Sequence, residues 1–210
     1  MTSSAVLAST LFALAAMAGA AQAHVPDGPK FVAAFRQACE PQRLSYEGTI
    51  ENLKSIGWAE VDPSVDPDVR KLVQVSDTSV LDAIKAEASG EDWKYRRVVY
   101  AAIIGGQPHV AIVTRLRAPK LDTLVGCYLY DLGATAPVDP QLVTDFLEVP
   151  VSQSVEERGM TGYIWGPSPK YRRTLETDLF YIAKGSLMRD SLGFAGVMLK
   201  FETSEPNGAE

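Results

Sequence analysis

The sequence predicts a single α+β domain, in which helices pack against an antiparallel sheet of about five to six strands. Apolar residues recur with helical spacing early in the chain, whereas short β-branched and aromatic runs dominate from Trp93 onward. No regular β-α-β alternation joins the two parts. The chain has 210 residues, is 46% hydrophobic, and shows neither an internal repeat nor an interdomain linker. We therefore expect one domain over residues 24–202 and a flexible tail over 203–210.

An N-terminal helical hairpin is the first predicted structure of the domain. Apolar residues at i, i+3, i+4, i+7 and i+8 from Phe31 predict a helix over about 28–39. Asp27 is a residue type that favours the start of a helix. Ser45 is suited to cap a second helix, and Gly57 is suited to the left-handed stop that ends it.

The next segment combines turns with two shorter predicted elements. The Asp-Pro pairs of residues 61–68 favour turns, because each proline fixes its own φ and restricts the residue before it. We expect a short strand over 69–75 and a third helix over about 77–88. Together with the hairpin, this makes the N-terminal half largely helical.

The second half of the chain is predicted to be mostly strands. Gly105 to Pro108 separates the first two runs and indicates a hairpin. Asp139-Pro140 predicts a helix that Pro150 stops, and Glu156 to Arg158 reads as a charged turn. The predicted strands cover residues 95–104, 109–117, 121–132, 159–165, 171–183 and 194–202.

The first 23 residues have the pattern of a cleaved secretory signal peptide. They carry no Asp, Glu, Lys or Arg, and an apolar core from Ala5 to Met17 leads to the small-residue end Ala21-Gln22-Ala23. The alternative is a retained membrane anchor, but the apolar run is short and no basic stop-transfer residues follow. We expect a mature chain that begins at His24, lies in the periplasm or is secreted, and has no membrane span.

Cys39 and Cys127 are the only two cysteines, and we expect them to form one disulfide bond. Export would place both thiols in an oxidising compartment. Their wide separation does not match the Cys-x-x-Cys spacing of redox-active pairs, so a structural role is favoured. The alternatives are two buried free thiols, or a redox or metal-binding use.

Composition and motifs argue against several functional classes. The net charge of −6 provides no long-range attraction to nucleic acid. The mature chain lacks the phosphate-binding glycine loops, the nucleophile elbow and the zinc-binding helix motif. With two histidines and two cysteines we expect no cofactor and no dedicated metal site. His24 at the mature terminus could still chelate copper or nickel through its amine and imidazole.

His109 is the catalytic candidate, because it is the only internal histidine of the mature chain. It follows the predicted hairpin turn and could act as a general base if a carboxylate oriented it. The alternative is a partly exposed polar residue with no catalytic role.

A second candidate site surrounds the Gly166 to Pro169 turn, where aromatic and arginine side chains could recognise a carbohydrate, a peptide or an anionic group. The alternative interpretation is that the aromatic side chains belong to the core and the basic ones to a solvated strand start. The candidate ligand-binding residues are Tyr163, Trp165, Tyr171, Arg172 and Arg173.

The chain resembles small exported proteins of Gram-negative, alphaproteobacterial type. The resemblance rests on the leader segment, Phe31-x-x-x-Phe35-x-x-x-Cys39, Gly57-Trp58 and Gly126-Cys127. It implies export to the periplasm and pairing of the two cysteines, and it brings no activity and no catalytic residues.

We expect a non-catalytic periplasmic or secreted protein that binds a partner protein, an envelope polymer or a small molecule. The first alternative is an envelope hydrolase or transferase whose carboxylates, with His109, converge only in the fold. The second is an accessory subunit or inhibitor of an envelope complex.

Overall fold

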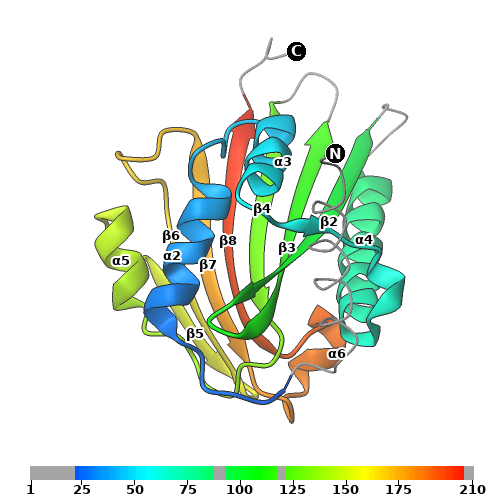
Figure 1. The fold of residues 1–210 in the computed structure, drawn as a ribbon. Helices are drawn as coiled ribbons and strands as arrows, with labels where there is room; N and C mark the ends of the chain where they lie inside the picture. The colour runs from blue at the N-terminus through cyan, green and yellow to red at the C-terminus, as the bar shows by residue number, and fades with distance from the viewer. Residues whose placement is uncertain (1–21, 88–92, 118–121, 206–210) are drawn as a thin grey trace, which may run out of the picture.

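Figure 1 shows the computed structural model, which describes residues 22–87, 93–117 and 122–205. The strands are β1 (Ala59–Glu60), β2 (Lys94–Ile104), β3 (Gln107–Arg117), β4 (Thr123–Asp131), β5 (Gln153–Glu157), β6 (Met160–Trp165), β7 (Thr174–Ile182) and β8 (Gly196–Glu205). The helices are α2 (Gly28–Cys39), α3 (Tyr46–Ser55), α4 (Pro67–Glu87), α5 (Gln141–Leu147) and α6 (Met188–Leu192), with a 3-10 turn η2 (Pro63–Val65).

All eight strands belong to one antiparallel sheet in the order β1-β2-β3-β4-β8-β7-β6-β5. The predicted α+β class is confirmed, but the sheet has eight strands rather than five to six. The two strands missing from the prediction are the edge strands. β1 is two residues long, and β5 is largely exposed and carries Glu156 and Glu157, which were expected in a turn. Short and charged edges protect a sheet from pairing with other chains.

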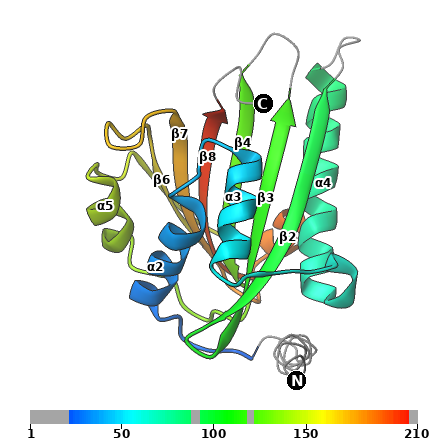
Figure 2. The ribbon, with the colours of Figure 1, turned by 45° about the horizontal axis from the view of Figure 1, so that its top comes forward.

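Helices cover both faces of the sheet (Figures 1 and 2). On one face, α2, α3 and α5 pack over a core that includes Phe35, Leu53 and Phe201. On the other face, α4 and α6 pack over a second core that includes Leu72 and Phe194. Because successive side chains of a strand point to opposite faces, each central strand contributes to both cores.

The N-terminal helices form as the sequence predicts. The Asp27 side chain caps α2 by accepting a hydrogen bond from the Lys30 backbone N–H at 3.1 Å. Ser45 caps α3 through the Gly48 N–H, also at 3.1 Å. Asn52 then links the two helices by donating to backbone carbonyls at the end of α2.

The predicted strand over 69–75 is wrong, because these residues lie inside α4. Pro67 occupies the first helical position, and the Asp66 carboxylate accepts hydrogen bonds from the next free N–H groups. The apolar residues Val69, Leu72 and Val73 therefore follow helical spacing and pack against the sheet.

The break expected before residue 77 is also absent, so one helix replaces the predicted strand and the third helix. Thr78 and Ser79 lie inside this helix, close to the expected start at residue 77. Their hydroxyl groups instead donate to the carbonyl groups of Gln74 and Val75 one turn earlier. This bonding satisfies the hydroxyls inside a continuous helix.

The ends of two late strands differ from the prediction. β7 begins at Thr174 rather than at Tyr171, because the preceding residues form a turn. β8 continues to Glu205, so residues 203–205 belong to the sheet and not to the expected tail. Residues 206–210 of the expected tail and residues 1–21 of the expected signal peptide lie outside the described residues.

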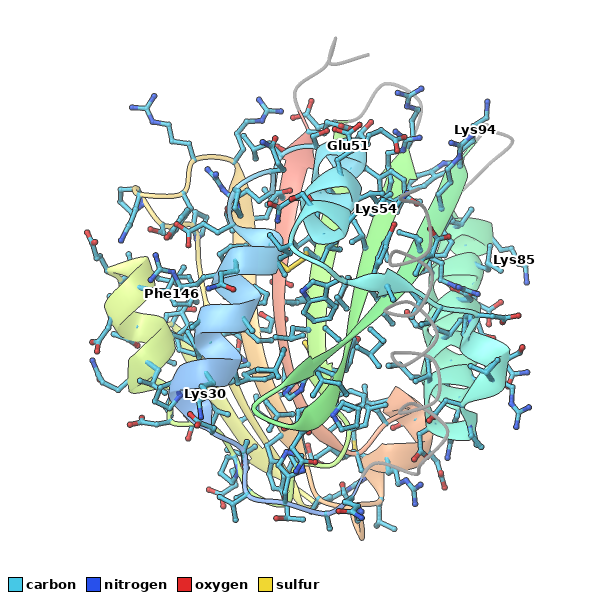
Figure 3. All side chains as sticks on the ribbon, viewed as in Figure 1. Lys30, Glu51, Lys54, Lys85, Lys94 and Phe146 are labelled. Carbon is cyan, nitrogen blue, oxygen red and sulfur yellow. A yellow bond between two sulfur atoms is a disulfide. The ribbon has the colours of Figure 1, made fainter. Side chains whose placement is uncertain are left out.

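The predicted disulfide between Cys39 and Cys127 is confirmed. It joins the C-terminal residue of α2 to β4 at the centre of the sheet, with a Cα–Cα distance of 5.7 Å, and is drawn as a yellow bond in Figure 3. Both cysteines are buried in the core under α2. None of the helices in the described ranges has the length and hydropathy needed to cross a membrane.

Candidate functional site

Three polar residues from distant parts of the chain meet at one end of the sheet. His24 precedes α2, His109 lies in β3, and Asp131 ends β4. The antiparallel pairing of Val110 with Tyr130 sets His109 and Asp131 opposite each other on neighbouring strands. The two histidines of the chain therefore approach the same carboxylate.

The Asp131 carboxylate is the centre of this cluster. Its Oδ2 atom lies 2.9 Å from His24 Nε2 and 3.6 Å from His109 Nε2. Its Oδ1 atom accepts a hydrogen bond from the Gly133 N–H at 3.2 Å. The Asp131 side chain is only 1% exposed, so its charge depends on these partners rather than on water.

The second nitrogen of each imidazole ring also faces an oxygen. His109 Nδ1 is 3.0 Å from the Gln107 carbonyl, and His24 Nδ1 is 2.9 Å from the Gln22 carbonyl. Burial lowers the pKa of His109, and this effect outweighs the Gln107 carbonyl and the Asp131 carboxylate, which favour the charged ring. The alternative interpretation of His109 as a partly exposed residue is wrong, because His109 is buried within β3. Its Nδ1 is within hydrogen-bond distance of the Gln107 carbonyl, whereas its Nε2 lies 3.6 Å from Asp131 Oδ2.

The residues around His24 are held by backbone hydrogen bonds. The His24 N–H donates to the Gly133 carbonyl at 3.1 Å, and the Thr135 N–H donates to the His24 carbonyl at 2.8 Å. These bonds form an isolated parallel bridge between His24 and Ala134. The start of the expected mature chain is thus fastened to the loop after β4.

Two adjoining hollows lie between α2 and the end of β2. The smaller has a volume of about 140 Å³ and borders His24, His109 and Asp131. The larger has a volume of about 460 Å³, and the two share Lys30 and Ile104. Lys30 lies at the beginning of α2, near the turn between β2 and β3 (Figure 3).

We call the larger hollow the α2–β2 groove. Small side chains on facing elements leave this space unfilled, and two partly exposed isoleucines, Ile56 and Ile103, border it. The groove is lined by Lys30, Ala33, Ala34, Gln37, Ile56, Gly57, Trp58, Ala59, Ala101, Ala102, Ile103 and Ile104.

The outer edge of β2 is open where it borders the groove. β1 pairs with Tyr100 and Ala101 only, and the Val61 N–H donates to the Val99 carbonyl further along the same edge. Backbone groups of an antiparallel strand alternate between its two edges, so those of Val99, Ala101 and Ile103 point to this side. Beyond Ala101, no strand of the described chain lies beside that edge.

The aromatic residues of the second predicted site belong largely to the core. Trp165 is fully buried, and its Nε1 donates to Thr144 Oγ1 at 3.0 Å. Tyr171 is buried beside Phe146 and donates to the Glu40 carboxylate at 2.8 Å, while burial raises its pKa to about 12. Tyr163 is partly buried and packs beside Trp165.

The two arginines of that site differ in their contacts. Arg173 donates to the Ser204 carbonyl and to the Asp122 carboxylate, and its backbone has a positive φ of 67°. Arg172 is exposed, and its carbonyl accepts a hydrogen bond from Arg43. None of the five predicted residues lines the α2–β2 groove, and ligand binding by them stays a prediction.

A separate charged cluster occupies the sheet face that carries α4. Lys200 Nζ lies 2.6 Å from Glu176, 2.9 Å from Asp178 and 3.3 Å from Glu202. Burial opposes the charge of Lys200, but the surrounding carboxylates outweigh burial and raise its pKa. Burial also raises the pKa of Asp178. The cluster joins β7 to β8 through buried charge pairing.

Sequence reasoning missed Asp131 and the groove. Asp131 looks like an ordinary polar residue at the end of a strand, and only the pairing of β3 with β4 brings it to His109. The groove depends on alanines of α2 and β2, and no single one of these alanines suggests a binding site in the sequence. In the part of the chain that the structure describes, no three metal-ligating side chains form a metal site.

Comparison with known proteins finds no relative of this chain. No model of a known protein family matches the chain, and no curated protein or solved structure is significantly similar to it. Functional inference therefore depends on the geometry of the site.

Proposed function

We propose that this is a non-catalytic periplasmic or secreted protein that binds an extended apolar segment of a partner protein in the α2–β2 groove. The segment adds as a short strand to the open edge of β2. The observation that carries this proposal is the position of Ile103, a half-exposed residue that borders the groove and whose backbone groups point to the open edge.

An extended peptide suits this site better than a compact ligand. β1 is already a short extended segment on the same edge, and a bound peptide would continue its line past Ala101. Backbone hydrogen bonds would provide affinity, while side-chain contacts with the groove would provide specificity. The groove volume of about 460 Å³ lies within the usual range of about 300–1,000 Å³ for binding pockets.

The lining of the two hollows supports binding rather than catalysis. No serine, threonine or cysteine of the described residues borders either hollow. Lys30 is paired with Asp27 at 2.7 Å, and both nitrogens of His109 face protein oxygens. The lining thus supplies none of the hydroxyl or thiol groups that usually act as nucleophiles.

The disulfide supports a location outside the cytoplasm, because such bonds persist in oxidising compartments. The proposed location also follows from the leader pattern of residues 1–23. Both point to a partner in the periplasm or outside the cell.

The test is a selection of peptides from a random library, followed by affinity measurements on variants. Ala33 is an exposed residue of α2 that lines the groove, so Ala33→Phe should fill it. Ile103→Pro removes the N–H that would pair with the peptide. We expect each change to weaken binding at least tenfold.

The matched control is Ala83→Phe, which makes the same change on an exposed position of α4 away from the groove. It should leave the peptide affinity unchanged. If the selected peptides bind Ala33→Phe and Ile103→Pro as tightly as the unaltered chain, the proposed site is wrong.

A further inference from the structure

His24 combines features that matter only if the chain begins at this residue. Cleavage after Ala23, as the sequence predicts, would turn the His24 backbone nitrogen into a primary amine. We propose that the mature chain then binds one Cu²⁺ ion through the α-amine and Nδ1 of His24, with Asp131 positioning the ring. This site is independent of the proposed peptide groove and rests on cleavage at Ala23.

The buried carboxylate sets the state of the imidazole ring. Asp131 Oδ2 lies 2.9 Å from His24 Nε2, so it holds the ring proton on that nitrogen. The other nitrogen, Nδ1, then carries the lone pair that a metal needs. Because Asp131 is almost fully buried, this orientation is fixed by the fold rather than by solvent.

The position beside Nδ1 is occupied by a group that leaves with the signal peptide. In the uncleaved chain His24 Nδ1 faces the Gln22 carbonyl at 2.9 Å. Removal of residues 1–23 takes this oxygen away and frees Nδ1. The same cut creates the amine, so both donors arise in one step.

Both donors lie against Gly133. The His24 nitrogen is 3.1 Å from the Gly133 carbonyl, and a Cβ at residue 133 would lie 3.0 Å from His24 Nδ1. It would also lie 2.6 Å from the Gln22 carbonyl oxygen, next to the space that cleavage vacates. The lack of a side chain at this glycine therefore leaves room for an ion.

The donor set favours Cu²⁺. An amine and an imidazole nitrogen are typical copper ligands, and Cu²⁺ binds such sites more tightly than the other divalent first-row ions. Water completes the coordination. His109 is not a ligand, because its Nε2 faces Asp131 and its Nδ1 faces the Gln107 carbonyl.

The experiment uses protein exported from the full precursor, with intact mass confirming that it begins at His24. Cu²⁺ affinity is measured by calorimetry against a competing chelator, and electron paramagnetic resonance counts the nitrogen ligands. We expect one ion with two nitrogen donors. His24→Ala should abolish this signal, and Asp131→Asn should weaken binding by about 10–100-fold, as is usual for partners of a ligating histidine.

Three controls separate this site from adventitious copper. His109→Gln should retain the two-nitrogen signal, because His109 does not coordinate the ion. A fusion left uncut before His24 has an amide in place of the amine and should lose the site. A synthetic peptide of residues 24–28 lacks Asp131 and should bind at least tenfold more weakly than the protein.

Several results would overturn the proposal. These are a mature chain that does not begin at His24, a processed protein that binds no Cu²⁺, and equal affinities for the processed protein, the uncut fusion and the short peptide. Gly133→Ala, which crowds Nδ1, provides a second test if Asp131→Asn does not fold.

Discussion

The Nε2 atom of His24 lies 2.9 Å from Oδ2 of Asp131, although the two residues are 107 positions apart. The same oxygen lies 3.6 Å from Nε2 of His109. One buried carboxylate therefore holds the expected mature terminus and the β3 histidine at the same end of the sheet. This arrangement also predicts how the stability of the fold depends on pH.

His109 should make the protein less stable as the pH falls from 7 to 5. Burial lowers its pKa in the folded state, whereas the unfolded chain has the ordinary value near 6.5. Below that value the unfolded state binds the proton more readily, so the free energy of unfolding decreases, by at most about 1.4 kcal/mol per pH unit for one proton. Denaturant titrations of the unaltered protein and His109→Gln at several pH values measure this difference.

The His109→Gln variant should show a shallower loss of stability over this pH range than the unaltered protein. Identical slopes for the two proteins would show that His109 does not carry the pH dependence.

Removing the disulfide should cost stability. Cys39 and Cys127 are 88 positions apart, and the chain-entropy argument assigns about 4–5 kcal/mol to a loop of this length. We expect the double serine variant to lose about 2–5 kcal/mol in the free energy of unfolding, measured by urea titration. A reducing agent should destabilise the unaltered chain and leave the variant unaffected. A variant as stable as the oxidised protein would contradict this prediction.

Gly162 should not tolerate a side chain. It pairs with Phe180 on the neighbouring strand, and a Cβ at residue 162 would overlap the Phe180 ring. Gly162→Ala should therefore destabilise the protein by about 1–3 kcal/mol, as overpacking does. Gly185→Ala is the matched control, because nothing lies within 4 Å of a Cβ at that position. Equal stabilities of the two variants in urea titrations would be the contrary result.

Lys200 should matter more for stability than an exposed lysine. Lys200→Met leaves Glu176, Asp178 and Glu202 without their shared cation, which should cost about 3 kcal/mol at pH 7. The loss should shrink as the pH falls toward 4, because burial raises the pKa of Asp178 and so favours its neutral form. Lys184→Met, at an exposed position, is the control and should change little. If the loss of stability in Lys200→Met does not depend on pH, the lysine stabilises the protein through packing and not through its charge.

Much of the fold could be predicted where local chemistry and packing agree. The helix expected over about 28–39 forms at Gly28–Cys39, because capping by Asp27 and the apolar spacing from Phe31 support the same structure. The strand over 69–75 was wrong, because β-branched valines suggested a strand while Pro67 and Asp66 started a helix. β5 was missed because an exposed edge strand has no buried apolar face to mark it.

The candidate site could be predicted only in part. The sequence singled out His109 as the only internal histidine and His24 as the expected mature terminus. It could not identify Asp131 as their partner, because that contact depends on the register between β3 and β4. The open edge beside Ile103 could not be predicted from the sequence either, because it depends on the residue at which the pairing of β1 with β2 ends.

The most direct test of the proposed function is amide hydrogen exchange, measured by nuclear magnetic resonance with and without a selected peptide. The Ile103 N–H points to the open edge, whereas the Ala102 N–H points to β3. Added-strand binding predicts that exchange at Ile103 slows at least tenfold while exchange at Ala102 stays the same. Unchanged exchange at Ile103 in a saturated complex would contradict the account.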